Sequence, residues 1–216
     1  FADINQNTMN IDTSHVRQLM NKNVRAIICV HYGGLPCDMD ELQSIANEWG
    51  VPIIEDAAHA VGAKYKGVNI GSISEFTMFS FQAIKHITTG DGGMLVLNDK
   101  NLVDKAERIR WFGIDRKSKQ AGIWENDITE VGYKYQMTDI SAAMGIASLA
   151  EFDEQSKIRK KIFNVYEDEL SNCERLKIVG SGFTDREHAA WLFTVIVQDR
   201  FKLQKKLREN NIESNQ

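Results

Sequence analysis

Polar residues that could do chemistry follow two short apolar runs of this sequence, residues 51–54 and 76–81. Each run is short and sharply bounded, which predicts a buried strand of an α/β sheet. The polar residues at their ends are Glu55, Asp56 and His59 after the first run, and Ser80 and Lys85 at the second. Ligands of open α/β sheets bind at the carboxyl ends of strands, so these side chains can face one crevice.

An acid, a hydroxyl and a lysine in one crevice suit pyridoxal 5'-phosphate. A carboxylate can keep a heteroaromatic nitrogen protonated, a hydroxyl can bind a phosphate, and a desolvated lysine can form a Schiff base with an aldehyde. Taken singly, Asp56 and Lys85 are more often a turn cap and a solvated lysine. However, Lys85 precedes TTGDGG at residues 88–93, a turn that lets the backbone approach a ligand closely. The combination favours a cofactor site.

The segment before the first run predicts a parallel β-α-β unit. Residues 26–30 are a β-rich buried run, and residues 31–36 form a loop that either touches a ligand or only connects. Residues 38–49 predict a helix with capping-box-like spacing at its start, and Gly50 ends it before the strand at 51–54.

The rest of the chain predicts a large domain at residues 1–150, an interdomain helix at 151–172 and the start of a smaller α+β domain at 173–216. The further predicted elements are the end of a strand at 1–4, a helix from Asp12 or Thr13 to Met20, a turn at 65–67, a strand at 94–97, a helix from Asp99, a helical pattern from Thr138 that restarts at Phe152, strands at 177–179 and 191–197, and a helix at 201–209. Residues 113–130 read as a long polar loop whose basic residues either suit a nucleotide diphosphate or are simply solvated.

Composition excludes several other classes of function. The 216 residues carry 26 basic and 30 acidic side chains, a net charge of −4, with no basic stripe for nucleic acid and no polybasic membrane patch. No apolar run has the length of a membrane span, and the start lacks the features of a signal peptide, so a cytoplasmic protein is the simplest interpretation. The cysteines Cys29, Cys37 and Cys173 fit neither a disulfide framework nor a zinc site, and we predict no metal.

Three collinear motifs carry a family resemblance. They are EDAAHAVGAKYKG at residues 55–67, FSFQAIKHITTGDGGMLV at 79–96 and GYKYQMTDISAAMG at 132–145. Together they resemble the successive signatures of the sugar-nucleotide aminotransferases, the pyridoxal-phosphate enzymes of the DegT/StrS family. The resemblance implies the aspartate-aminotransferase fold: an α/β domain with a mixed, mostly parallel sheet flanked by helices, followed by a smaller C-terminal domain.

The resemblance also implies roles for single residues. Lys85 matches the Schiff-base lysine, Asp56 the partner of the pyridine nitrogen and Ser80 a phosphate ligand, while His59 stands where the family places Gln or His against the cofactor ring. A residue of the third motif, usually Asn, reaches the phosphate site of the neighbouring subunit. Lys134 and Gln136 occupy the candidate positions, and we expect Gln136 to make this contact.

Homodimers with shared active sites are the assembly that the resemblance implies. Tyr133, Tyr135 and Met137 alternate with Lys134 and Gln136, which suits either an interface with a polar tip or a half-buried strand. The chain starts at Phe1, and we expect it to lack the family's N-terminal segment and most of the small domain.

The leading hypothesis is transfer of an amino group from an amino acid, glutamate by resemblance, to a nucleotide-linked keto-sugar. Two alternatives stay open. One is a non-catalytic homologue or an inactive fragment, and the other is a different pyridoxal-phosphate reaction, because a fold does not fix a reaction.

Overall fold

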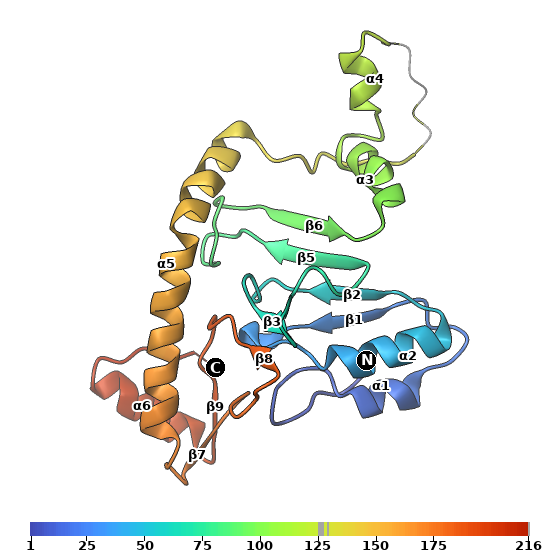
Figure 1. The fold of residues 1–216 in the computed structure, drawn as a ribbon. Coiled ribbons are helices and arrows are strands. Elements are labelled where there is room, and N and C mark those ends of the chain that lie inside the picture. Colours follow the sequence, from blue (N-terminus) through green and yellow to red (C-terminus); the bar gives the residue numbers. More distant parts are fainter. Residues whose placement is uncertain (125–127, 129, 216) are drawn as a thin grey trace.

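A four-stranded sheet forms the centre of the computed structural model, which describes residues 1–124, 128 and 130–215. The sheet order is β1 (Ile27–Val30), β2 (Ile53–Asp56), β5 (Phe76–Ser80) and β6 (Gly93–Leu97). The first three strands are parallel and β6 runs antiparallel to β5. The carboxyl ends of the parallel strands therefore meet at one edge, on the side of helix α5 (Asp139–Leu170) (Figure 1). The predicted mixed, mostly parallel sheet is confirmed.

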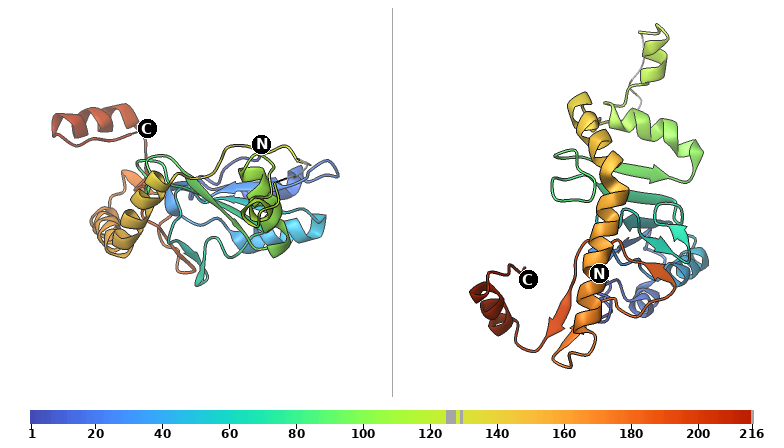
Figure 2. Two further views of the ribbon diagram at one scale, coloured as in Figure 1. Left: turned by 90° about the horizontal axis from the view of Figure 1, so that it is seen from above. Right: turned by 60° about the vertical axis from the view of Figure 1, so that its left-hand side comes forward.

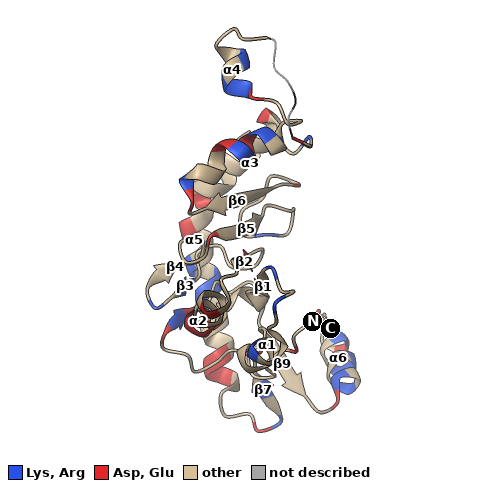
Figure 3. Cartoon of the chain, turned by 90° about the vertical axis from the view of Figure 1, so that its right-hand side faces the viewer, with Lys and Arg blue, Asp and Glu red and all other residues tan. Residues whose placement is uncertain are grey.

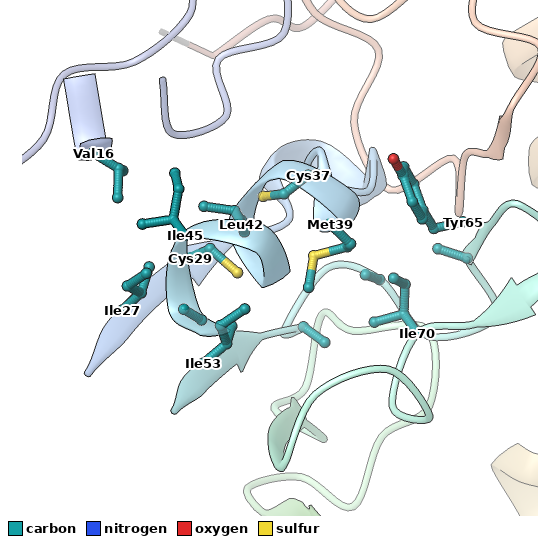
Figure 4. Packing of buried hydrophobic residues seen from close by; sticks show 14 of the residues in the cluster. Val16, Ile27, Cys29, Cys37, Met39, Leu42, Ile45, Ile53, Tyr65 and Ile70 are labelled. Carbon is teal, nitrogen blue, oxygen red and sulfur yellow. The ribbon is translucent and has the colours of Figure 1, made fainter. Parts of the chain in front are cut away.

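Helix α2 (Met39–Trp49) covers one face of this sheet, beside α1 (Thr13–Leu19). The buried side chains of this layer come from α2 and from alternate positions of β1 and β2, and they include Ile27, Cys29, Leu42, Ile45 and Ile53 (Figure 4). Alternate residues of a strand point to opposite faces, so this core fixes which side chains of each strand face inward. The predicted β-α-β unit is confirmed.

The start of α2 differs from its prediction. Asp38 precedes the helix, but its side chain caps no backbone N–H and instead accepts a hydrogen bond of 2.9 Å from the hydroxyl of Tyr65. Gly50 ends the helix as expected, in the left-handed conformation with φ of 63°. The carboxylate of Asp38 thus ties α2 to β3 (Lys64–Tyr65), which forms a short hairpin with β4 (Val68–Asn69).

The opposite face of the sheet is open in this chain. Its exposed apolar side chains are Ile28, Val30, Met78 and Leu95, which are 42–60% exposed. The strand register pairs Asp56 with Val30 and Met78, so Asp56 lies on this same face. Strand β2 begins later than the predicted strand at 51–54, and it contains Glu55 and Asp56 instead of ending before them.

Helix α5 is continuous over 32 residues, and the side chain of Thr138 caps its first turn through the amide of Ser141. It crosses the predicted boundary at residue 150 without interruption, and the division into domains stays a prediction. Several of its apolar residues lie at the surface of this chain, and Ile140 and Leu149 are 79% and 60% exposed.

The remaining elements lie around this framework. They are η1 (Tyr32–Gly34), η2 (Lys100–Leu102), α3 (Val103–Arg110), α4 (Arg116–Gln120), β7 (Leu176–Ile178), β8 (Arg186–Glu187), β9 (Val195–Val197) and α6 (Arg200–Glu209). Strand β8 pairs with β3, and β7 pairs with β9, while α6 stands away from the other elements (Figure 2). Within the described ranges, no helix has the length and apolar character needed to span a membrane.

Two predictions for irregular segments need correction. Residues 1–4 form no strand, because Ile4 makes only an isolated bridge to Ile11. The polar loop at 113–130 contains the short helix α4, although residues 125–127 and 129 of that prediction lie outside the described residues.

A buried hydrogen-bond network fixes β2 against its neighbours. The carboxylate of Glu55 is fully buried and accepts hydrogen bonds from His31 Nε2 at 2.8 Å, the Ser74 amide at 3.0 Å and the Thr77 hydroxyl at 3.1 Å. His31 Nδ1 accepts from the Cys37 amide, which leaves Nε2 as the donor to Glu55. Burial alone would raise the pKa of Glu55, but the hydrogen bonds from His31 and Ser74 hold it below its usual value.

Replacing Glu55 tests the weight of this network. We expect Glu55→Leu to lower the free energy of unfolding by roughly 3–5 kcal/mol, because it strands the buried donors of three residues. Glu41→Leu is the control, since it removes an exposed ion pair with Arg17 and should cost at most about 1 kcal/mol. Urea unfolding of both variants measures the difference, and equal small losses would contradict the assigned role.

Candidate functional site

Asp56 and Ser80 are the last residues of neighbouring parallel strands. The register pairs Asp56 on β2 with Met78 on β5, and Ser80 follows Met78 by two positions, so both polar side chains lie on the open face. The Asp56 carboxylate accepts a hydrogen bond of 3.0 Å from the Ala58 amide, and the Ser80 hydroxyl accepts one of 3.3 Å from the Gln82 amide. An acid and a hydroxyl thus lie on the same face at the ends of two neighbouring strands.

Lys85 and His59 meet at the indole ring of Trp191. The Nζ of Lys85 lies 5.0 Å from the ring centroid, and the imidazole of His59 stacks on the same ring at 5.5 Å with an interplanar angle of 24°. Burial lowers the pKa of His59, the positive charge of Lys85 lowers it further, and the negative charge of Asp56 opposes both effects. Asp56 and Lys85 therefore both lie close enough to His59 to act on its charge.

The residues at this edge fit pyridoxal phosphate by their chemistry. A carboxylate, a hydroxyl and an amine are the three partners that the cofactor's ring nitrogen, phosphate and aldehyde require. In addition, His59 Nδ1 is buried and has no hydrogen-bond partner, although buried polar atoms are normally paired. An uncharged imidazole of this kind can pack against a ring or accept a hydrogen bond from a ligand.

Gln136 does not join this group within the chain. No hydrogen bond in the described part of the chain links it to Asp56, His59, Ser80 or Lys85, and its Oε1 is buried without a partner. Its neighbours Tyr133 and Tyr135 are exposed and stack on each other at 4.9 Å. The alternative of a regular half-buried strand is wrong, because only an isolated bridge joins Lys134 to Trp111.

The basic segment around α4 also lies away from Lys85. Helix α4 projects beyond the β6 edge of the sheet, and its lysines and arginine stand at that tip (Figure 3). Lys117 is engaged by Asp104 at 2.8 Å and Glu107 at 3.0 Å. Whether this segment binds a nucleotide diphosphate or is simply solvated stays a prediction.

Trp191 and His86 are site neighbours that the sequence did not reveal. Trp191 was assigned to a strand, but it lies in the loop before β9. Burial lowers the pKa of His86 to about 4, and its Nε2 donates a hydrogen bond of 2.9 Å to the carbonyl of Ala189. The only sequence signal for His86 was its position next to Lys85.

The chain is similar to proteins of one family. The family model described as the DegT/DnrJ/EryC1/StrS aminotransferase family matches residues 1–216. GDP-perosamine synthase of Escherichia coli O157:H7 is 33% identical over 99% of the chain and 57% of its own length. UDP-4-amino-4,6-dideoxy-N-acetyl-beta-L-altrosamine transaminase of Campylobacter jejuni subsp. jejuni serotype O:23/36 is 37% identical over 79% of the chain and 45% of its own length. The chain spans about half the length of the curated relatives it matches.

Solved structures agree with the fold and with the cofactor. Spr1654 from Streptococcus pneumoniae, solved in a PMP form and a PLP form, is 28% identical. Its PMP form superposes with a TM-score of 0.89 over 99% of the chain and 61% of its own chain. These forms, together with the family match, support pyridoxal phosphate as the cofactor. The chain belongs to the DegT/DnrJ/EryC1/StrS aminotransferase family.

Proposed function

We propose that the whole protein transfers an amino group from an amino acid, most simply glutamate, to a nucleotide-linked keto-sugar. The observation that carries this proposal is that Asp56, Ser80 and Lys85 lie at one edge of the sheet. His59 lies near both the acid and the amine, and the charges of Asp56 and Lys85 shift its pKa in opposite directions. The names of the GDP- and UDP-linked relatives support the substrate class. A cytoplasmic location stays a prediction.

Bound pyridoxal phosphate supplies an aldehyde that amines attack and a ring that accepts electrons from a reacting carbon. Lys85 would hold the aldehyde carbon through its Nζ. Once an incoming amine has freed it, the same nitrogen would carry a proton between the donor's α-carbon and the cofactor. Asp56 would keep the proton on the ring nitrogen, and the ring can only accept electrons well in that state.

Ser80 and His59 would orient the cofactor. The Ser80 hydroxyl already receives one backbone N–H, so its own proton is free to bind a phosphate oxygen. Burial and the charge of Lys85 lower the pKa of His59, which favours the uncharged imidazole. An uncharged ring can pack against the cofactor without forming an ion pair with the carboxylate of Asp56. The site thus separates one negative group, one neutral ring and one amine over a short edge.

A second copy of the chain would complete this site. Tyr133, Tyr135 and Ile140 are 47–79% exposed, which is unusual for apolar side chains this close together. Between them, the buried Oε1 of Gln136 lacks a partner. Burial of this segment against a partner subunit would bring the amide of Gln136 to a phosphate that the partner's chain holds.

Chemical trapping tests the assignment of Lys85. Borohydride reduction of the whole protein loaded with pyridoxal phosphate should fix the cofactor to the peptide FSFQAIK, and glutamate added before reduction should release it as the amine form. Lys85→Arg should abolish trapping, because a guanidinium forms no such bond. The control Lys64→Arg alters an exposed ion pair with Glu187 and should leave trapping unchanged. A label on Lys64 or Lys66 would overturn the assignment.

Subunit complementation tests the role of Gln136. Lys85→Arg removes the reactive amine, and Gln136→Glu places a negative charge against the phosphate, so each variant alone should be inactive. Co-expression should restore about one quarter of the parent activity, because half of the dimers are mixed and each mixed dimer has one intact site. If Gln136 acted within its own chain, co-expression would restore nothing.

A further inference from the structure

The loop that carries Trp191 is held in place by residues from two strand ends. The amide of Ala189 donates to the carbonyl of Gly34 at 2.9 Å, and the amide of Trp191 donates to the carbonyl of Gly33 at 3.2 Å. His86, the neighbour of Lys85, donates to the carbonyl of Ala189 at 2.9 Å. The loop is therefore hydrogen-bonded to the segment after β1 and to the turn after β5, although more than one hundred residues separate it from each of them in the sequence.

Gly34 shows how closely the loop packs against these strand ends. Its φ is 101°, and a Cβ at this position would lie 2.9 Å from the carbonyl oxygen of His59 and 3.0 Å from the Cβ of Ala189. No side chain fits there. The approach of residues 189–192 to the segment that carries His59 is thus a packed contact that fixes the backbone of Trp191.

The indole ring of Trp191 gathers groups from three elements. Lys85 and Arg159 place their charged groups 5.0 Å and 5.5 Å from its centroid, and the rings of His59 and His86 lie at 5.5 Å and 5.2 Å. Cations within about 6 Å of an indole face are attracted by its quadrupole, and Trp is the strongest of the aromatic side chains in this respect. One ring thus contacts both the amine and the neutral imidazole of the site.

We propose that Trp191 is a positioning residue for Lys85. This inference rests on the proposed role of Lys85 as the covalent anchor of the cofactor. A lysine side chain loses much rotamer freedom when it is fixed. If the Trp191 ring already restricts Nζ, part of this entropy is lost before the cofactor binds, and bonding costs less. The same ring also stacks on the imidazole of His59. Trp191 therefore favours capture of an aldehyde by holding the side chain of Lys85 in place.

Two cofactor forms separate this role from general packing. Pyridoxal phosphate binds both through its phosphate and through Lys85, whereas pyridoxamine phosphate has no aldehyde and cannot bond to a lysine. We expect Trp191→Leu, made in the whole protein, to weaken pyridoxal phosphate binding about tenfold more than pyridoxamine phosphate binding, because the unrestrained lysine must then lose its rotamer freedom when it bonds the aldehyde. Trp191→Phe should give a smaller selective loss of about threefold, since a phenyl face attracts cations less strongly.

Trp49→Leu is the matched control, because Trp49 lies on α2, is 40% exposed and should change neither affinity. Equal weakening of both cofactor forms by Trp191→Leu, or no weakening, would overturn the proposal. If Trp191→Leu does not fold, Trp191→Phe decides: an unchanged ratio of the two affinities would overturn it as well. Failure of the proposed function is distinguishable, because the parent protein would then show no borohydride-reducible bond at Lys85.

Discussion

The hydrogen bonds of the buried Glu55 carboxylate determine which way the next residue faces. Glu55 and Asp56 are adjacent on β2, so the pleat sends them to opposite faces of the sheet. His31, Ser74 and Thr77 hold Glu55 inside, and Asp56 must then lie on the open face. A shift of the β2 register by one residue would bury Asp56 and expose Glu55. Two carboxylates next to each other in sequence thus face opposite ways, one into the core and one onto the open face where we propose that the cofactor binds.

The site depends on segments that converge on the carboxyl edge from distant parts of the sequence. Strands β2 and β5 supply Asp56 and Ser80, and the turn after β5 supplies Lys85. Gly33 and Gly34 in the loop after β1 accept hydrogen bonds from the backbone of the Trp191 loop. The ring of Trp191 contacts Lys85 and His59. Backbone hydrogen bonds and the close contact at Gly34 hold the Trp191 loop in place, so this loop and the strand ends form one packed unit.

The sequence was sufficient for the local features and insufficient for the distant ones. The strand at Phe76, the end of α2 at Gly50 and the start of α5 at Thr138 depend on short-range periodicity and caps, and the sequence predicts them. The apparent cap Asp38 instead binds Tyr65, because a tertiary partner competes with the helix amides. Trp191 could not be placed, since its position depends on hydrogen bonds to a loop far away in the chain. The exposed apolar residues of α5 show that periodicity identifies a helix face but not what covers it.

Asp56 is proposed to hold the proton of the cofactor's ring nitrogen at the site that also contains Lys85. The most direct measurement is the ¹⁵N chemical shift of pyridoxal phosphate labelled at the ring nitrogen and bound to the whole protein. We expect a protonated nitrogen in the parent and an unprotonated one in Asp56→Asn, with the cofactor still bound to Lys85 in both. The same chemical shift in the two proteins would contradict it.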